Sequence, residues 1–275
     1  MTAILLCMFH TFSPMEAYGW AHKPEVQFSH TERGNMNLEE KVRANIIPEH
    51  LAVIMDGNRR WAKKKGLSTS EGHREGAMRV IDLVRNCADL GVKYLSIYAF
   101  STENWRRNRK EVDYLMNLLV EFVAKELDYM NKNGVKIILM GNIESLPEKT
   151  KHEVKQSIEL TKNNKKLNLN IALSYGSRNE IVGAVKKIIK DYENKKIKID
   201  DINDESFKNY LFTSGMPDPD LLIRTSGEIR LSNFLLYQIA YTEFYFSDVL
   251  WPDFKKEELL KAFDSFQNRK RRYGN

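Results

Sequence analysis

The stretch His50-Leu-Ala-Val-Ile-Met-Asp-Gly-Asn-Arg-Arg-Trp61 decides how the rest of the chain is interpreted. Its five apolar residues, 51–55, have the length and composition of a buried strand. They end at Asp56-Gly57-Asn58, which is typical of a turn, and a basic segment compatible with a helix begins at Arg59. We therefore expect a carboxylate at the tip of a strand, next to two arginines and a helix N-terminus.

This arrangement suggests a metal-assisted phosphate site. In an open α/β sheet, ligands bind in the crevice outside the carboxyl ends of the strands. Helix N-termini and arginines bind phosphates there, but an aspartate repels them unless a divalent cation lies between. Mg²⁺ is commonly held by one or two carboxylates together with substrate phosphates. A strand-end turn followed by a solvated basic helix explains the same residues equally well at this point.

Length, charge and cysteine content limit the size of the domain, the kinds of molecule that the protein binds and its compartment. The chain has 275 residues, of which 42% are hydrophobic, which suits one large α/β domain or two small ones. Its net charge of +6 is compatible with nucleic acids, anionic membranes or phosphorylated small molecules. The two cysteines, Cys7 and Cys87, have no metal-ligand spacing and suggest a reducing compartment, so we expect a cytoplasmic protein.

Strand-like and helix-like segments alternate along the chain. The expected strands cover residues 51–55, 92–100, 135–140, 167–173, 221–223 and 242–246. The expected helices cover residues 73–89, 111–131, 147–163, 179–194, 205–212, 233–240 and 255–272. This alternation predicts an α/β fold, a single domain over residues 41–275 with a mainly parallel central sheet flanked by helices. Residues 1–40 are expected to be a variable, poorly ordered extension.

Three local expectations accompany this fold. Apolar and polar residues alternate in 167–173, which predicts a strand exposed on one face, and residues 66–72 are expected to be a loop. The broad apolar face of 111–131 predicts either a core helix or the wall of an apolar tunnel. Right-handed crossovers would place Asp56, residues 101–107, residues 175–178 and Arg224 on one edge of the sheet.

A second polar stretch follows the strand at 221–223. Arg224-Thr-Ser-Gly-Glu-Ile-Arg-Leu-Ser232 carries two arginines and three hydroxyl residues in nine positions. Forked donors and hydroxyls suit the oxygens of a diphosphate. The chain has no G-x-x-x-x-G-K-[ST] loop and no G-x-G-x-x-G, so its sequence favours neither a P-loop enzyme nor a dinucleotide-binding fold.

Together, these stretches resemble the cis-prenyltransferase family, which includes undecaprenyl diphosphate synthase and dehydrodolichyl diphosphate synthase. The similarity covers about residues 48–275, and its motifs occur in the order found in the family. They are His50-x-Ala-x-Ile-Met-Asp-Gly-Asn-x-Arg-Trp-Ala62, Gly72-His73, Tyr98-Ala-Phe-Ser-x-Glu-Asn-Trp105, Asn170-x-Ala-x-x-Tyr-Gly176, Asp220-Leu-Leu-Ile-Arg-Thr-x-Gly-Glu-x-Arg-Leu-Ser-Asn-Phe-Leu-Leu-Tyr-Gln238, Glu243, Trp251-Pro-Asp253 and Arg271-Arg-Tyr-Gly274.

The resemblance implies a reaction and a set of site residues. An allylic diphosphate, typically farnesyl diphosphate, is extended by repeated addition of isopentenyl diphosphate to a long cis-polyprenyl diphosphate such as undecaprenyl diphosphate, with Mg²⁺ as cofactor. The resemblance implies that Asp56 binds Mg²⁺ and acts in catalysis, that Asn104 is catalytic, and that Glu243 shares the metal, within one chain or across a dimer interface. The substrate-binding residues that it implies are Gly57, Asn58, Arg59, Arg60, Trp61, His73, Ser101, Thr102, Glu103, Trp105, Arg107, Arg224, Arg230, Leu231 and Ser232.

The resemblance also implies partners. We expect a homodimer with an apolar substrate tunnel, with peripheral membrane contact through its product and no nucleic-acid partner. The alternative is a non-catalytic scaffold subunit of a heteromeric prenyltransferase, a class that lacks the active-site aspartate, whereas Asp56 is present here. One departure from the family is Thr69, which stands where many members carry an arginine that holds the allylic diphosphate.

One competing motif needs a separate interpretation. Asp200-Asp-Ile-Asn-Asp204 matches the D-D-x-x-D metal motif of trans-prenyltransferases. Those enzymes are all-helical and carry a second aspartate-rich motif, which this chain lacks. We therefore interpret Asp204 as the N-cap of a short helix.

Overall fold

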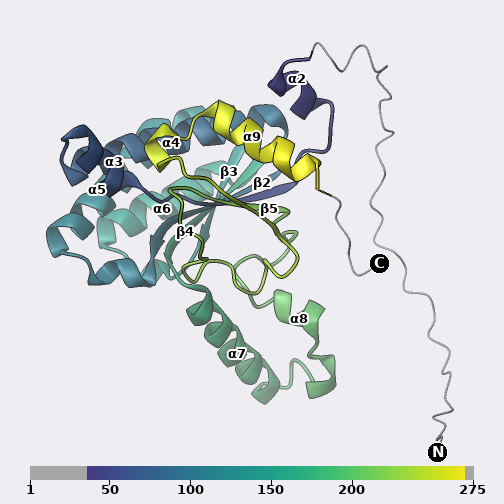
Figure 1. Ribbon diagram of the computed structural model, residues 1–275. Coiled ribbons are helices and arrows are strands. Elements are labelled where there is room, and N and C mark those ends of the chain that lie inside the picture. The colour runs from purple at the N-terminus through teal and green to yellow at the C-terminus, as the bar shows by residue number, and fades with distance from the viewer. Residues whose placement is uncertain (1–35, 270–275) are drawn as a thin grey trace, which may run out of the picture. The chain divides into compact units, whose positions relative to one another are not determined.

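The computed structural model describes residues 36–269, which are organised around a six-stranded sheet (Figure 1). The strands are β1 His50–Ile54, β2 Tyr94–Ser101, β3 Val135–Met140, β4 Leu167–Tyr175, β5 Leu221–Arg224 and β6 Glu243–Phe246. Their order is β3-β4-β2-β1-β5-β6, and every neighbouring pair is parallel. The predicted α/β class with a parallel sheet flanked by helices is confirmed.

The helices connect these strands and pack around the sheet (Figure 1). They are α2 Leu38–Arg43, α3 Asn58–Lys65, α4 Thr69–Leu90, α5 Arg109–Lys132, α6 Glu148–Thr161, α7 Ser177–Glu193, α8 Asp204–Lys208 and α9 Lys256–Gln267. The short 3-10 helices are η1 Thr102–Arg106, η2 Ile143–Ser145, η3 Ile199–Asp201 and η4 Trp251–Asp253. Within residues 36–269, no helix is long and apolar enough to cross a bilayer.

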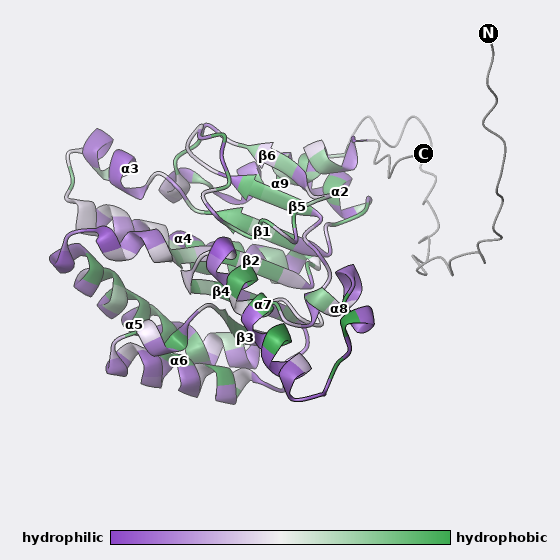
Figure 2. Ribbon diagram, turned by 90° about the horizontal axis from the view of Figure 1, so that it is seen from below, coloured by the Kyte–Doolittle hydropathy of each residue, from purple (hydrophilic) through white to green (hydrophobic). Residues whose placement is uncertain are grey.

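One face of the sheet carries the larger core. Alternate strand residues such as Leu51 and Val53 pack there against α4, α5 and α9. The hydropathy colouring shows the apolar strands enclosed between helices whose outer faces are polar (Figure 2). Burial of this continuous apolar layer is the main favourable term in the stability of the domain.

The opposite face of the sheet carries a smaller core and a buried polar network. Ala52 and Ile54 pack against Phe234 and Leu235 in an irregular segment. On this face His50 is fully buried, and its Nδ1 lies 2.7 Å from the carbonyl oxygen of Pro217. A carbonyl only accepts hydrogen bonds, so Nδ1 carries the proton. His50 Nε2 then accepts from the Ser96 hydroxyl at 2.7 Å, and that hydroxyl oxygen accepts from Asn170 Nδ2 at 3.0 Å.

Four local expectations are wrong. Strand β4 is not open on one face, because both faces of the sheet are covered there: Asn170 is fully buried and no residue of the strand is exposed. Residues 233–240 form turns rather than a helix, since Asn233 and Leu235 adopt positive φ angles of 64° and 46°. The expected loop 66–72 is shorter, because α4 already begins at Thr69. The N-cap of α8 is Asn203 and not Asp204.

The ends of the domain differ in detail from the expected boundaries. Helix α2 begins at Leu38, so it spans the boundary that was expected after residue 40. Its Val42 is fully buried in the core, and α2 packs against α9. Helix α9 ends at Gln267, five residues before the expected end at Arg272. The structure describes the chain as far as residue 269, so the motif 271–274 lies outside the described residues.

The buried His50 makes stability depend on pH in a defined direction. Burial lowers its pKa from 6.5 to about 4. Because the folded-state pKa lies below the unfolded value, protons bind preferentially to the unfolded chain as the pH falls below about 6.5. Relative to a His50→Asn variant, the wild type should lose about 2 kcal/mol of unfolding free energy between pH 7 and pH 5.

Chemical denaturation of both proteins at the two pH values measures this difference. The asparagine side chain of the variant keeps an N–H donor for the Pro217 carbonyl but does not titrate, so all other ionisable groups cancel in the comparison. Parallel pH dependences of the two proteins would contradict the assignment of a neutral, buried His50.

Candidate active site

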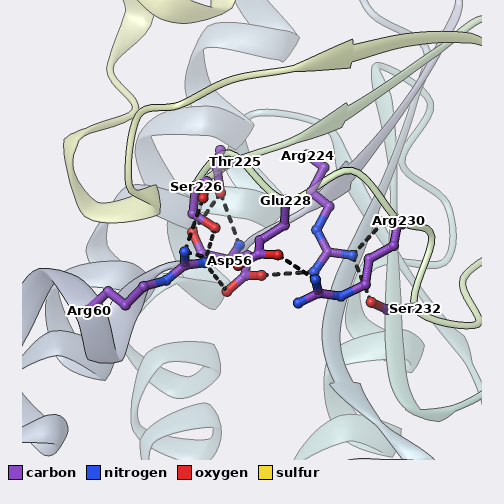
Figure 3. A network of polar contacts seen from close by, with 8 residues as sticks. All are labelled: Asp56, Arg60, Arg224, Thr225, Ser226, Glu228, Arg230 and Ser232. Carbon is purple, nitrogen blue, oxygen red and sulfur yellow. Dashed lines mark hydrogen bonds and ion pairs between the residues drawn. The ribbon is translucent and has the colours of Figure 1, made fainter.

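Asp56 lies two residues after the end of β1 and two residues before the start of α3 (Figure 3). Its backbone N–H donates to Thr225 Oγ1 at 2.9 Å, and the Thr225 hydroxyl donates to the Asp56 carbonyl at 2.7 Å. The next residue, Gly57, has a φ of +114°, and a Cβ there would lie 3.0 Å from Leu250 and 3.1 Å from Ser226. Only glycine fits this turn without strain. The turn places the N-terminus of α3 next to Asp56.

Two arginines from different elements reach the Asp56 carboxylate (Figure 3). Arg224, at the end of β5 and only 3% exposed, donates from Nη2 to Asp56 Oδ2 at 2.8 Å and from Nη1 to Ser232 Oγ at 2.7 Å. Arg60, from the first turns of α3, lies 3.4 Å from Asp56 Oδ1. Arg224 Nη1 also donates to the Arg230 carbonyl. All three partners of Arg224 are hydrogen-bond acceptors, which offsets the cost of burying its charge.

A second carboxylate, Glu228, ties Arg60 to Arg230 (Figure 3). Arg60 Nη1 lies 3.0 Å from Glu228 Oε1 and donates to the Ser226 carbonyl at 3.1 Å. Ser226 and Ser232 have positive φ angles of 78° and 50°, so the loop between them is held in a conformation that ordinary residues avoid. The loop thereby brings Arg224 and Arg230 to the carboxylates of Asp56 and Glu228 (Figure 3).

Glycines in α4 let α3 approach closely. A Cβ at Gly72 would lie 2.4 Å from the Asn58 carbonyl oxygen, and one at Gly76 would lie 2.4 Å from Asn58 Oδ1. Side chains at either position would push the N-terminus of α3 away from α4. These two glycines therefore place Asn58 and the arginines that follow it beside the start of α4.

A cavity of about 500 Å³ opens at this junction. The polar residues that line it are Asp56, Gly57, Asn58, Arg59, Arg60, His73, Asn104 and Arg107. The rest of its lining is almost wholly apolar and includes Ala77, Val80, Ile81, Ile97, Leu115, Leu118, Leu119, Phe122, Val123, Met130, Leu169 and Ile171. The cavity follows α5 from Leu115 to Met130, which corresponds to about 22 Å along a helix.

His73 joins the wall of the cavity from α4. Its side chain is 7% exposed, and Nε2 lies 3.2 Å from Glu111 Oε1 in the first turn of α5. Burial lowers the pKa of His73, and the Glu111 carboxylate opposes that shift. Glu111 also lies 3.2 Å from Arg107 Nη1 and 3.6 Å from Arg59 Nη2. Side chains from α3, from α4 and from the C-cap of η1 thus converge on one carboxylate of α5.

The 3-10 helix η1 continues this wall after β2. Asn104 lines the cavity, and its Oδ1 accepts from the Ser101 backbone N–H at 3.1 Å. Trp105 is anchored elsewhere, because its Nε1 donates to Ser174 Oγ at 2.9 Å. Glu103 Oε1 accepts from Asn233 Nδ2 at 2.9 Å, and Glu103 Oε2 accepts from the Thr102 hydroxyl at 3.2 Å.

Most residues expected at the site lie around the cavity or the Asp56 network. Leu231 is the apolar member of the group and packs against the smaller core. Trp61 lies outside the cavity lining, and its Nε1 donates to Asp253 Oδ1 at 2.9 Å. Glu243 pairs in the sheet with Leu221, at the end of β6 opposite to the Asp56 network. Within one chain, Glu243 instead lies 2.7 Å from Arg269 Nη1.

Several residues of the site were not predicted. Thr225, Ser226 and Glu228 lie inside the stretch 224–232, and that stretch alone could have indicated them. Glu111 was treated only as the first residue of a helix, although its spacing of four from Arg107 was a signal for an ion pair. Thr69 is the first residue of α4 and is not among the residues that line the cavity.

The donor set at Asp56 fits a magnesium ion that is shared with a substrate. Residues 36–269 contain no group of three or more His, Cys, Asp or Glu side chains that could hold a metal ion by themselves. Mg²⁺ is typically held by one or two carboxylates and completes its shell with phosphate oxygens and water. Asp56 supplies one such carboxylate at the cavity, and its side chain is 30% exposed.

Comparisons with known proteins agree with this geometry. A family model described as "Putative undecaprenyl diphosphate synthase" matches residues 54–274. The isoprenyl transferase of Clostridium perfringens is 51% identical over 245 residues, which cover 89% of this chain and 97% of the relative. The isoprenyl transferase of Bacillus thuringiensis is 48% identical over 252 residues, which cover 92% and 95% of the two chains.

Two solved structures share the fold. The crystal structure of lavandulyl diphosphate synthase from Lavandula x intermedia, in complex with dimethylallyl diphosphate, has a TM-score of 0.81 and 36% sequence identity. It covers 86% of this chain and 100% of its own. A structure described as "a probable undecaprenyl diphosphate synthase" from Campylobacter jejuni has a TM-score of 0.69 and 35% identity over 84% of this chain and 100% of its own. The chain therefore belongs to the undecaprenyl diphosphate synthase family of isoprenyl transferases.

Proposed function

We propose that this prenyltransferase catalyses the Mg²⁺-dependent, sequential condensation of isopentenyl diphosphate onto an allylic diphosphate, with farnesyl diphosphate as the starter. The product is a long-chain cis-polyprenyl diphosphate such as undecaprenyl diphosphate. One observation carries the proposal: a single cavity has Asp56 and a group of cations at its polar end and apolar walls along α5. The complex of lavandulyl diphosphate synthase with dimethylallyl diphosphate supports an allylic diphosphate as the ligand of this site.

The hydrogen-bond donors of the site divide into two groups that suit two diphosphates. Arg59, Arg60 and His73 lie near the N-termini of α3 and α4, and we assign them to the allylic diphosphate. Arg224 and Arg230 follow β5, and with Ser232 we assign them to isopentenyl diphosphate. Arg224 Nε is buried without a hydrogen-bond partner in the described residues, which suits an additional anionic acceptor.

The chain's own residues account for the main electrostatic demands of the reaction. Loss of the allylic diphosphate leaves negative charge on that group, and the guanidinium of Arg60 is placed to stabilise it. Asp56 is the residue that would hold Mg²⁺, and the ion would supply further neutralisation of this charge. The apolar residues along α5, such as Leu118 and Phe122, exclude water from the allylic cation and accommodate the growing hydrocarbon. We assign Asn104 to the reacting carbons because it lines the same cavity as Asp56 and the apolar residues of α5.

Incorporation of radiolabelled isopentenyl diphosphate tests the activity. With farnesyl diphosphate and Mg²⁺, we expect labelled products several isoprene units long. EDTA should abolish their formation, because without the metal the Asp56 carboxylate repels the diphosphate instead of helping to hold it. Separation of the dephosphorylated products by size gives the chain length. Absence of incorporation by the folded protein would contradict independent catalysis and would favour the scaffold-subunit alternative.

Replacement of Asp56 tests its assignment. An Asp56→Asn variant keeps the side-chain size but loses the charge that binds the metal, and we expect kcat to fall about 10²–10³-fold. Asp82→Asn is the matched control, because Asp82 pairs with Arg79 on the outer part of α4 and is 45% exposed. Its turnover should stay within about twofold of the wild type. Wild-type turnover in Asp56→Asn would remove Asp56 from the mechanism.

We also propose that the protein is a homodimer formed through α7. Val182, Val185, Ile189 and Tyr192 are 43–55% exposed and follow a 3-4-3 spacing, which places them on one side of the helix. The neighbouring side of the helix, with Ala184 and Ile188, is buried. A second copy of the chain offers the same apolar stripe, so a two-fold interface would be self-complementary. We assign Glu243 a share in the metal only across a subunit interface, because within one chain it pairs with Arg269 at the end of β6 opposite to Asp56.

Size-exclusion chromatography with light scattering tests the dimer. A Val185→Glu/Ile189→Glu variant should be monomeric, because it buries two charges against the same two charges of the partner. Leu160→Glu on α6 is the control, since Leu160 is 52% exposed on another helix, and this variant should remain dimeric. A monomeric wild type, or a dimer that survives the double substitution, would contradict the proposal.

A further inference from the structure

One carboxylate, Glu111, is shared by three of the groups that face the cavity. Its Oε1 lies 3.2 Å from both His73 Nε2 and Arg107 Nη1, and its Oε2 lies 3.6 Å from Arg59 Nη2. Among the described residues, Arg59 and Arg107 have no other carboxylate within ion-pair distance. Glu111 is therefore the principal counter-charge of this part of the cavity.

The position of Glu111 is not explained by capping of α5. Asn108 is the N-cap, and its side chain accepts from the Lys110 backbone N–H at 2.9 Å. The Glu111 side chain is only 14% exposed, whereas Asp113, two residues later, is 62% exposed. A carboxylate in the first helical turn gains from the helix dipole when it is exposed as well. Its burial against three donors indicates a role toward the cavity.

Glu111 lies behind the donors rather than among the groups that line the cavity. Arg59, His73 and Arg107 all line the cavity, and Glu111 does not. Any anion bound by these three groups would therefore lie on their cavity side, with the Glu111 carboxylate behind them. The carboxylate gathers the donors, but its charge also repels the anion that they bind.

We propose that Glu111 is a positioning residue that acts as an internal counter-anion, lowers the affinity of the three donors for diphosphate and so allows the released pyrophosphate to leave. This inference rests on the proposed use of Arg59, His73 and Arg107 for a diphosphate. Each condensation cycle releases one pyrophosphate, and a site made of uncompensated arginines would retain it. A carboxylate that remains paired with the donors when the site empties favours release.

Isothermal titration with inorganic pyrophosphate tests the inference without prenyl transfer. In EDTA, the Glu111→Gln variant should bind pyrophosphate roughly tenfold more tightly than the wild type, because the neutral amide keeps the size but not the repulsion. The Glu111→Asp variant keeps the charge and should bind within about threefold of the wild type. Glu121→Gln, which removes the same charge from an exposed pair with Arg74, should change the affinity less than about twofold.

Steady-state kinetics supplies the second readout. The Glu111→Gln variant should show a lower KM for the allylic diphosphate together with a lower kcat and stronger inhibition by pyrophosphate. If Glu111 only tethered the arginines, its loss would raise the dissociation constant and the KM instead. Unchanged or weaker pyrophosphate binding by Glu111→Gln, or equal tightening in Glu111→Asp, would overturn the inference. A wild type that binds no pyrophosphate would overturn both the inference and the proposed diphosphate site.

Discussion

The pairing of Asp56 with Arg224 is the interaction on which the site depends. It joins the carboxyl ends of β1 and β5, which are neighbouring parallel strands, at a distance of 2.8 Å. From β1 the chain crosses first to β2 on one side, and it returns much later to β5 on the other side. Strand order therefore reverses between β1 and β5, and ligands of open α/β sheets bind at such a point. The fold creates the crevice, and the ion pair keeps a nearly buried arginine beside a carboxylate that can bind a metal.

Much of this architecture could be predicted from the sequence, because it depends on local patterns. The apolar run before Asp56 and the alternation of strands and helices were sufficient for a parallel sheet with Asp56 and Arg224 on one rim. The errors occurred where tertiary contacts override local pattern. Residues 233–240 are apolar enough for a helix, but positive φ angles at Asn233 and Leu235 turn the chain instead. In β4, polar residues such as Asn170 indicated an exposed face. Asn170 is nevertheless fully buried, and the hydrogen bond from its Nδ2 to Ser96 Oγ offsets part of the cost of that burial.

In the site as well, residues within an indicative stretch of sequence were predicted, and residues that depend on tertiary contacts were not. Asp56, Arg60 and Arg224 belong to stretches whose composition indicates phosphate binding. Glu111 gave no comparable signal, because an acidic residue in the first turn of a helix is ordinary. Its contacts with three other elements depend on how α3, α4 and α5 meet, and the close approach of α3 depends in turn on two glycines of α4. Internal carboxylates thus face both groups of donors: Glu228 lies among the residues after β5, and Glu111 lies behind the donors that line the cavity.

A crystal structure with a non-hydrolysable farnesyl thiodiphosphate tests the central claim most directly. That claim is that one cavity binds a diphosphate at its polar end and a hydrocarbon along α5. The account predicts that the diphosphate contacts the N-terminus of α3 and Arg60, with the farnesyl chain between α4 and α5 against residues such as Leu118 and Phe122. A diphosphate bound away from Asp56, or a farnesyl chain lying outside the cavity, would contradict it.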